Sequence, residues 1–293
     1  VMADTLGEVA YQAAGKLPTR APDNDIRGVA PPPGWLAHYD WTGWLPTNQN
    51  PALDHASIEK KGWHATANQN ILPPGYVHFV GGDWTTPERF ERIEQLLAAN
   101  PKHTRESLQA IQNDVTSLGA RTLLPVLRQA QPQHALGAKA LNILNAFDGQ
   151  MKTDSAAALI FNVWADELTR SLLAPQLGKE RFQLLYGKRH FRAAVEGILQ
   201  RSDPFWCGSI GCSAQVSAAL DRALRRISAQ QGADLNRWRW GAWHPAISIH
   251  KPFGKVPYLN ALFDVRTESS GDLFTVNVGQ YWANDKQEPF ANR

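Results

Sequence analysis

"DWTTPERFERIEQLL", residues 83–97, separates two kinds of sequence in this chain and so decides the predicted fold. From residue 1 to about 84, short apolar runs alternate with loops rich in proline and glycine, a pattern typical of strands and loops. Within the stretch, Thr86 and Pro87 form a helix start signal, as N-cap and first helical residue. Apolar residues then follow at helical spacing, namely Phe90, Ile93, Leu96 and Leu97. The sequence therefore predicts that a strand-and-loop segment ends here and a helical segment begins.

Helical spacing continues to about residue 231. A second helix is predicted from Thr104, with one apolar stripe from Leu108 to Leu118 that Gly119 and Pro125 then perturb. Further helices are expected from Asp154 or Ser155, over about 178–200, and over about 214–231.

Strand-like sequence stands on both sides of this helical segment. The chain opens on "VMADTLGEVAYQ", which predicts a strand, a tight turn at Leu6-Gly7 and a second strand. After Trp238 the strand candidates are "AISIH" (246–250), "NALFDV" (260–265) and "LFTVNV" (273–278). The prediction is an α+β fold with three segments, 1–84, 85–231 and 232–293, in which the helical segment is an insertion into a larger sheet. We expect this sheet to be incomplete at both ends of the sequence.

Composition excludes some classes of function. The chain has 293 residues, of which 43% are hydrophobic and 19% charged, enough to bury a sizeable core. Its net charge is +3, and the basic residues are scattered along the chain, which disfavours a nucleic-acid partner. The sequence has no apolar run of membrane-spanning length, so no membrane partner is expected.

The two cysteines, Cys207 and Cys212, stand close together in "FWCGSIGC". A metal site is disfavoured because the sequence has no second cysteine pair and no histidine close by. A local disulfide and two inert buried thiols both remain open. The glycines between the cysteines favour the disulfide, and a disulfide favours an oxidising compartment.

"HATANQN", residues 64–70, is a row of small and amide-bearing residues without charge. Taken as a strand, it would place His64, Thr66, Asn68 and Asn70 on one face. That face is either a solvated strand edge or a set of hydrogen-bond donors. An uncharged amide can donate an N–H to a developing negative charge, which is what an oxyanion site requires.

Arg89 is unusual among the charged residues of the predicted helix. It lies within roughly 50° of the centre of the apolar face, whereas Arg92 lies further off. An arginine at this position usually extends to solvent or pairs with a carboxylate, unless a site lies near it.

Seven segments, in this order and with consistent spacing, resemble the penicillin acylase (penicillin amidase) family of N-terminal-nucleophile hydrolases. They are "ADTLGEVAYQAAGKLPTR" (3–20), "YDWTGWLPTNQNP" (39–51), "WHATANQN" (63–70), "DWTTPERFERIEQLL" (83–97), "FDGQMKTDSAAALIFNVW" (147–164), "WRWGAWHPAISIH" (238–250) and "GDLFTVNVG" (271–279). The resemblance implies the αββα sandwich of that superfamily and identifies the chain as similar to an internal segment of the large (beta) chain.

The resemblance also implies a reaction. Family members are precursors that cleave themselves and expose an N-terminal serine, which attacks an amide carbonyl and forms an acyl-enzyme. In this chain the oxyanion-hole asparagine corresponds to Asn70, with Asn68 in support. Arg89 is similar to an arginine that orients the active site. The first residue is Val1, which lacks a nucleophilic side chain, so the nucleophile is expected outside this chain and the 293 residues alone are expected to be inactive.

Further expectations follow from the resemblance alone. It implies no organic cofactor but a structural calcium ion, with the Asp83 carboxylate and the Ile26 carbonyl among its ligands. It implies a periplasmic or secreted protein whose partners are a small alpha chain, the remaining beta-chain segments and a small N-acyl substrate, such as a β-lactam or an acyl-homoserine lactone. The alternative is a non-catalytic scaffold or binding module that keeps the fold.

Overall fold

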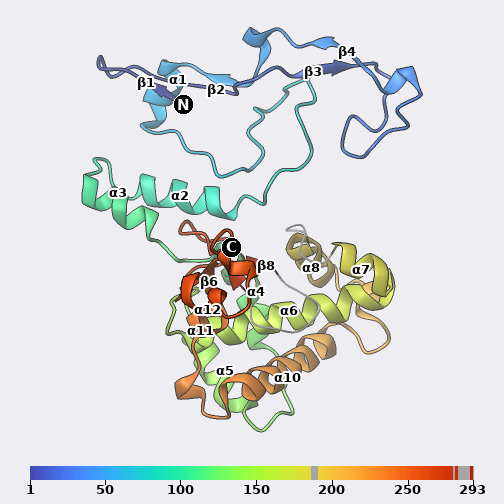
Figure 1. The fold of residues 1–293 in the computed structure, drawn as a ribbon, viewed down its shortest axis with the longest axis vertical. Coiled ribbons are helices and arrows are strands. Elements are labelled where there is room, and N and C mark those ends of the chain that lie inside the picture. The colour runs from blue at the N-terminus through green and yellow to red at the C-terminus, as the bar shows by residue number, and fades with distance from the viewer. Residues whose placement is uncertain (186–190, 280, 283–290, 293) are drawn as a thin grey trace. The chain divides into compact units, whose positions relative to one another are not determined.

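The computed structural model describes residues 1–185, 191–279, 281–282 and 291–292, and these fall into two compact units (Figure 1). The N-terminal unit comprises residues 1–90 and 94–102, and the helical unit comprises residues 91–93 and 103–293. Each unit is described by itself.

The strands of the N-terminal unit are short and antiparallel. One sheet has the order β1 (Met2–Ala3), β2 (Val9–Gln12), β5 (Ala52–Leu53), and a second sheet pairs β3 (Pro18–Arg20) with β4 (Trp41–Trp44). The predicted opening hairpin is confirmed. In its turn Asp4 Oδ1 accepts the N–H groups of Leu6 and Glu8, and Gly7 has φ +87°, a value that favours glycine.

Short helices complete this unit. They are the 3-10 helices Ala37–Tyr39 and Thr47–Gln49, helix α1 (His55–Lys61) and most of helix α2 (Glu88–Ala98), of which residues 91–93 are grouped with the helical unit. The start predicted for α2 is corrected by one residue, because Pro87 is itself the N-cap and no side chain caps this end.

The N-terminal unit has little apolar core. Every one of its residues is described, and its buried hydrophobic side chains are Leu45, Ile58 and Ala67. Three tryptophans have at least half of their surface exposed, namely Trp35 at 84%, Trp41 at 59% and Trp44 at 50%. The elements of this unit are therefore held mainly by backbone pairing and local hydrogen bonds.

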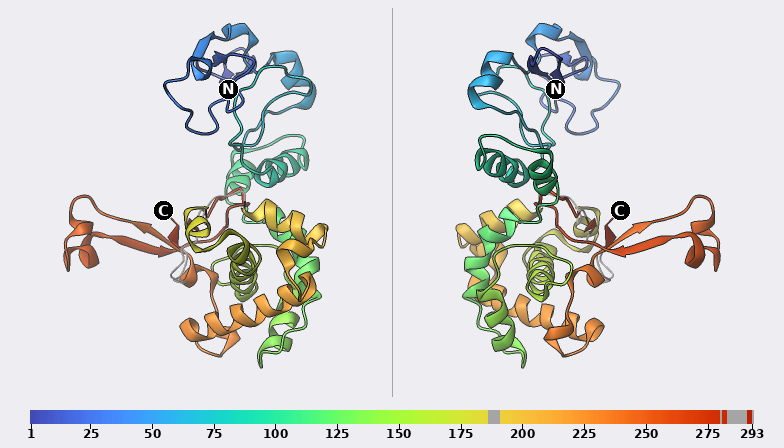
Figure 2. Two further views of the ribbon diagram at one scale, coloured as in Figure 1. Left: turned by 90° about the vertical axis from the view of Figure 1, so that its right-hand side faces the viewer. Right: turned by 90° about the vertical axis from the view of Figure 1, so that its left-hand side faces the viewer.

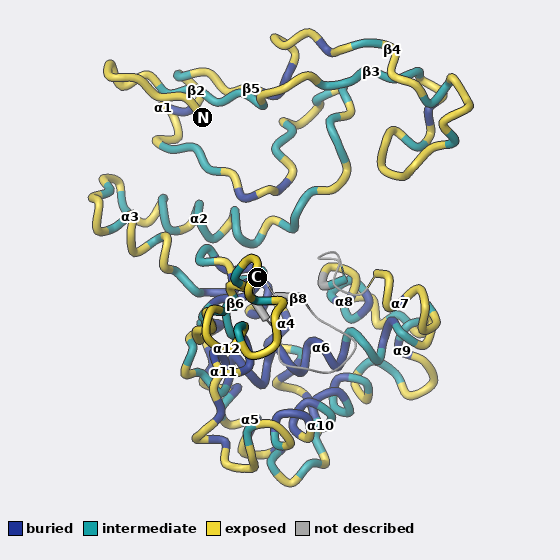
Figure 3. The backbone as a smooth tube through the Cα atoms, viewed as in Figure 1, coloured by how far each residue is buried: buried dark blue, intermediate teal, exposed yellow. Residues whose placement is uncertain are grey.

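The helical unit has a large apolar core around two long helices, α6 (Ala156–Leu177) and α10 (Cys212–Gln231) (Figure 3). Helix α6 starts within one or two residues of the predicted start at Asp154 or Ser155. Ser155 is its N-cap, and the Ser155 Oγ accepts the N–H of Ala158. The other helices of this block are α3 (Arg105–Gln112), α4 (Leu118–Arg128), α5 (Gly137–Asn145), α7 (Lys179–Leu185), α8 (Phe191–Gln200) and α9 (Pro204–Cys207).

The prediction of a single helix from about Thr104 with one apolar stripe as far as Leu118 is wrong, although a helix does start there and Thr104 caps it. The chain leaves the helix after Gln112 and starts α4 at Leu118, with Ser117 as the new N-cap. Between them Asp114 accepts the N–H of Thr116 through one carboxylate oxygen. These local side-chain bonds compete with the helix and interrupt it.

After α10 the chain forms a short mixed sheet with the order β7-β6-β9-β8. The strands of this sheet are β6 (Pro245–Ser248), β7 (Val265–Glu268), β8 (Tyr281–Trp282) and β9 (Ala291–Asn292). The same segment of the chain contains the 3-10 helices Leu235–Arg237 and Phe253–Lys255 and the helices α11 (Trp240–Trp243) and α12 (Leu259–Phe263). The antiparallel pair β6 and β7 carries α12 in its connection (Figure 2).

Two of the three strands predicted after Trp238 are corrected. "AISIH" overlaps β6, but "NALFDV" is mostly α12, and "LFTVNV" is a turn rather than a strand. In this turn Thr275 Oγ1 accepts the N–H of Asp272 and donates to the carbonyl of Asn277. The buried threonine hydroxyl thus closes the backbone on itself.

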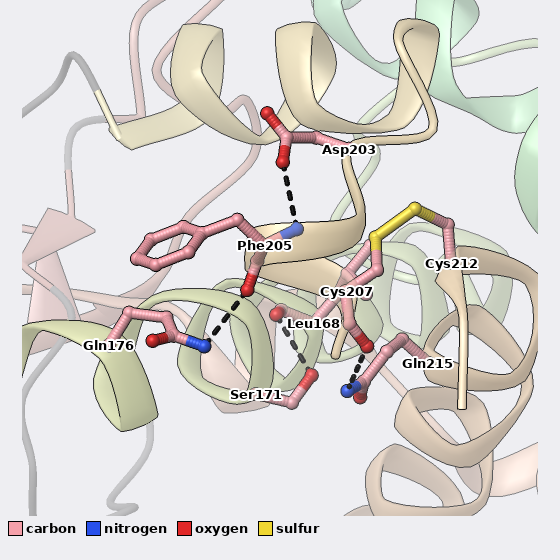
Figure 4. Close-up of a disulfide and its surroundings, with 8 residues drawn as sticks. All are labelled: Leu168, Ser171, Gln176, Asp203, Phe205, Cys207, Cys212 and Gln215. Carbon is pink, nitrogen blue, oxygen red and sulfur yellow. Dashed lines mark hydrogen bonds between the residues drawn. A yellow bond between two sulfur atoms is a disulfide. The ribbon is translucent and has the colours of Figure 1, made fainter. Parts of the chain in front are cut away.

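Cys207 at the end of α9 and Cys212 at the start of α10 form a disulfide, with Cα atoms 4.9 Å apart (Figure 4). Gln215 Nε2 donates to the carbonyl of Cys207, and Gln176 on α6 donates to the carbonyl of Phe205. The link therefore fixes the turn through which α9 leads into α10.

Among the described residues, no helix is both long and apolar enough to cross a membrane.

Candidate functional site

The "HATANQN" segment forms a bend, not the predicted strand. Asn68 has φ +66°, in the left-handed region that asparagine tolerates better than most residues. Gln69 is buried, and its Oε1 accepts the N–H of Ala67 at 2.7 Å. The common face expected for His64, Thr66, Asn68 and Asn70 is therefore corrected, because side chains alternate regularly only along an extended strand.

Thr85 ties this bend to the residues that precede α2. Its N–H donates to the carbonyl of Asn68 at 2.8 Å, and its Oγ1 donates to the carbonyl of Ala67 at 2.9 Å. Sequence reasoning missed Thr85, because one threonine in a loop carries no periodic signal.

Arg89, in the first turn of α2, reaches the same bend. Its Nη1 donates to Asn68 Oδ1 at 3.5 Å, at the long end of hydrogen-bond distances. The structure thus brings Arg89 and Asn68 together, two residues that the sequence singled out separately. Because the guanidinium binds the amide oxygen of Asn68, the amide nitrogen is the end of this side chain that remains to donate hydrogen bonds.

The side chain of Asn70 is exposed and held at one end. Its Oδ1 accepts the N–H of Leu72 at 3.0 Å, which fixes the direction of the amide. Its Nδ2 has no hydrogen-bond partner among the residues that the structure describes. Asn70 therefore presents two N–H donors to whatever lies beyond this surface.

His64 lies just before the bend with its ring 4.4 Å from the ring of Tyr11, measured between centroids. Burial, together with nearby positive charge that includes Lys61, lowers the pKa of His64. Its imidazole is therefore neutral at pH 7, and the groups offered by the segment from His64 to Asn70 are uncharged.

The predicted calcium ligands give an incomplete set within this chain. The Ile26 carbonyl accepts the N–H of Val29 at 3.0 Å, and Asp83 is exposed. Calcium takes six to eight oxygen ligands. Across the described ranges no three His, Cys, Asp or Glu side chains gather in a way that could hold a metal ion. Calcium binding stays a prediction.

Comparison with known proteins gives consistent matches. The family model described as penicillin amidase matches residues 1–292. The acyl-homoserine lactone acylase QuiP of Pseudomonas putida is 32% identical over 312 aligned positions, which cover 94% of this chain and 36% of that protein. The penicillin acylase 2 proenzyme of Pseudomonas sp. strain SE83 is 30% identical over 284 positions, which cover 94% of this chain and 35% of the proenzyme.

A solved structure has the same fold. The thermostable penicillin G acylase of Alcaligenes faecalis superposes with a TM-score of 0.61 at 21% identity, over 81% of this chain and 47% of that one. The mixed helix-and-strand fold is therefore that of a penicillin acylase, as the α+β prediction expected. The chain spans about a third of the length of the two curated relatives.

Proposed function

Since this chain belongs to the penicillin amidase family, we propose that it supplies the oxyanion-binding part of an acylase that hydrolyses N-acyl amide bonds of small molecules. The observation that carries the proposal is the amide of Asn70. Its oxygen accepts the N–H of Leu72, the residue is exposed, and its amide nitrogen has no hydrogen-bond partner among the described residues. Such a group donates hydrogen bonds at every pH at which the protein is folded.

In the proposed reaction a serine attacks the carbonyl carbon of the substrate amide. The C=O electron pair moves to oxygen, and Asn70 Nδ2 donates to the oxyanion that forms. Collapse of this intermediate breaks the C–N bond, releases the amine with a proton and leaves an acyl-serine. Water then hydrolyses the ester to the carboxylic acid and regenerates the hydroxyl. The attacking serine is part of the proposal and is placed outside these 293 residues.

Arg89 and Thr85 act in this proposal as positioning residues. Thr85 holds the backbone carbonyls of the bend, and Arg89 holds the amide oxygen of Asn68. An oxyanion donor is effective only if it is aimed before charge develops, so that no reorganisation is needed in the transition state. A rigid bend meets that requirement better than the solvated strand edge considered as the alternative.

Substrate, processing, location and metal belong to the same proposal. The names of the relatives support an N-acyl-homoserine lactone or a penicillin-type β-lactam as substrate. We place the protein in the periplasm or outside the cell, made as a self-cleaving precursor whose alpha chain and other beta-chain segments are its partners. A structural calcium ion would take Asp83 and Ile26 as two ligands, with further oxygens from those segments.

Two preparations test the function. The complete protein that contains this chain should release homoserine lactone and a fatty acid from an N-acyl-homoserine lactone, or the amine from a chromogenic N-acyl amide. The 293-residue chain alone should match the buffer blank. If the complete, correctly cleaved protein binds these compounds and hydrolyses none of them, the alternative of a non-catalytic binding module is correct. If the 293-residue chain alone hydrolysed the substrate, the proposal that the attacking serine lies outside this chain would be wrong.

A further inference from the structure

A pocket in the N-terminal unit, separate from the bend, contains two cationic side chains. Its volume is about 260 Å³, and its lining includes Arg20 and Arg27 together with the apolar residues Leu17, Leu45, Val77 and Phe79. Asp and Glu are absent from this lining, every residue of which is described.

Both guanidinium groups lack a carboxylate partner within the described residues. Arg20 Nη1 donates only to the carbonyl of Pro18, at 3.5 Å, and its guanidinium passes over Gly28. The Arg27 guanidinium lies over the ring of Phe79, 5.7 Å from its centroid. The nearest acids in sequence, Asp23 and Asp25, do not line the pocket and form no ion pair with either arginine.

The backbone at Arg27 is held in an uncommon conformation. Its φ is +51°, and its N–H donates to Oδ1 of Asn24 at 2.7 Å, a side chain that is only 3% exposed. A left-handed conformation costs free energy for a residue other than glycine, asparagine or aspartate, and is kept where the surroundings require it. Here it places a guanidinium on an aromatic ring at the wall of a pocket.

We propose that this pocket receives a carboxylate, and that the carboxylate is an Asp or Glu side chain from a segment of the same acylase outside residues 1–293. Planar guanidinium groups match carboxylates in shape and charge, and two of them in one pocket whose lining has no acid favour an anionic partner. The chain spans 36% of its acyl-homoserine lactone acylase relative, so most of the proposed polypeptide is available to supply the acid. The inference rests on the proposed function in one respect, that the chain works within a longer acylase.

The test converts the proximity of the two charges into a covalent bond. In the complete protein, Arg27→Lys and, separately, Arg20→Lys place a primary amine in the pocket while keeping the charge. A water-soluble carbodiimide then joins the amine to a touching carboxylate as an amide, and takes up the lost water as a urea. Peptide mass spectrometry locates the bond. Arg105→Lys is the control, since Arg105 is exposed and belongs to the other unit.

We expect a linked peptide in at least one pocket variant that joins position 20 or 27 to an acid outside residues 1–293, absent from the wild type and from Arg105→Lys. A link confined to Asp23 or Asp25 would overturn the inference. So would the absence of a link in both variants when their melting temperatures match the wild type, or NMR-detected binding of free hexanoate in the pocket of the complete wild-type protein. If the complete protein hydrolyses N-acyl amides but neither pocket variant forms the cross-link, the carboxylate proposal is wrong and the proposed function stands. If the cross-link forms but the complete wild-type protein hydrolyses no N-acyl amide, the proposed function is wrong and the carboxylate proposal stands.

Discussion

At the scale of single residues, neutral polar groups carry the chemistry that we assign to this chain. Asn70 is an exposed residue whose amide oxygen accepts a backbone N–H, so the side chain has a fixed direction without any charge. Asn68 adopts a left-handed backbone and meets Arg89. A carboxamide cannot gain or lose a proton near neutral pH, so its role as a donor does not vary as a histidine's would.

The buried His244 is expected to make the stability of the fold depend on pH. The side chain is 0% exposed and stacks on Trp240 with ring centroids 4.5 Å apart. Burial lowers its pKa to about 4 from the ordinary 6.5, against smaller opposing effects of hydrogen bonds with the backbone of Ser269 and Gly279. Above pH 6.5 the imidazole is neutral in both folded and unfolded chains. Between pH 6.5 and 4 the unfolded chain binds a proton that the folded chain does not, so stability falls as pH falls.

The expected loss over this range is on the order of 3 kcal/mol in the free energy of unfolding. Urea unfolding at pH 7.5, 5.5 and 4.5 measures it, and NMR of the labelled imidazole gives the pKa directly. His244→Gln, if it folds, should have a shallower slope of stability against pH. An imidazole that titrates near 6.5 in the folded protein would contradict the assignment.

At the scale of elements, helices α6 and α10 are joined by buried charges. Arg226 on α10 donates to both Asp166 and Glu167 on α6, and side chains of all three are at most 7% exposed. Arg170 and Arg222 complete the cluster at 3.2 Å and 3.4 Å from these carboxylates. Removal of Arg226 leaves each of the two buried carboxylates with only its remaining arginine, Arg170 or Arg222, and the loss of a shared buried partner is strongly destabilising.

Arg226→Met should therefore lower the free energy of unfolding by about 3–5 kcal/mol. The matched control is Arg222→Met, because Arg222 meets the same Glu167 but its side chain is 33% exposed. That change should have an effect of less than about 1 kcal/mol. Denaturant unfolding of the two variants compares them, and equal losses would show that the burial of Arg226 is not what matters.

The disulfide between α9 and α10 closes a short loop. Its cysteines are five positions apart, so in the chain-entropy account it stabilises the fold by at most roughly 2–3 kcal/mol. The double variant Cys207→Ser, Cys212→Ser should therefore have a free energy of unfolding that is lower than that of the wild type by no more than roughly 2–3 kcal/mol, as measured by denaturant unfolding. Alkylation of exported protein without reductant should leave its intact mass unchanged, and two alkylated thiols would contradict the disulfide.

The sequence predicted long elements better than short ones, for physical reasons. The start of α6 near Ser155 and the apolar residues that follow it could be predicted, because a buried helix is apolar over many turns. The break before α4 and the turn at Thr275 depend on single side chains that bond to the backbone, and such bonds leave no periodic pattern. The same holds for the site. Asn70 and Arg89 stood out in the sequence, whereas Thr85, which ties the bend, did not.

At the scale of the whole molecule, the two units have unequal cores. The helical unit surrounds α6 with buried side chains, whereas the N-terminal unit buries three hydrophobic side chains and leaves large tryptophan surfaces exposed. Tryptophan side chains are enriched where polypeptides contact one another. The candidate oxyanion donor and the cationic pocket both belong to this N-terminal unit. Its surfaces are consistent with work inside a larger acylase.

The most direct test of the account is the turnover of the complete protein with Asn70→Ala. Self-cleavage is checked first by mass, because it passes through a similar tetrahedral intermediate. We predict that kcat for an N-acyl amide falls by about 10²–10³ while KM stays nearly constant, the loss expected for one oxyanion donor. Asn68→Gly is the comparison: glycine accepts the left-handed backbone and only the positioning contact with Arg89 is lost, so kcat should fall far less than in Asn70→Ala. A wild-type kcat in correctly cleaved Asn70→Ala protein would contradict the account.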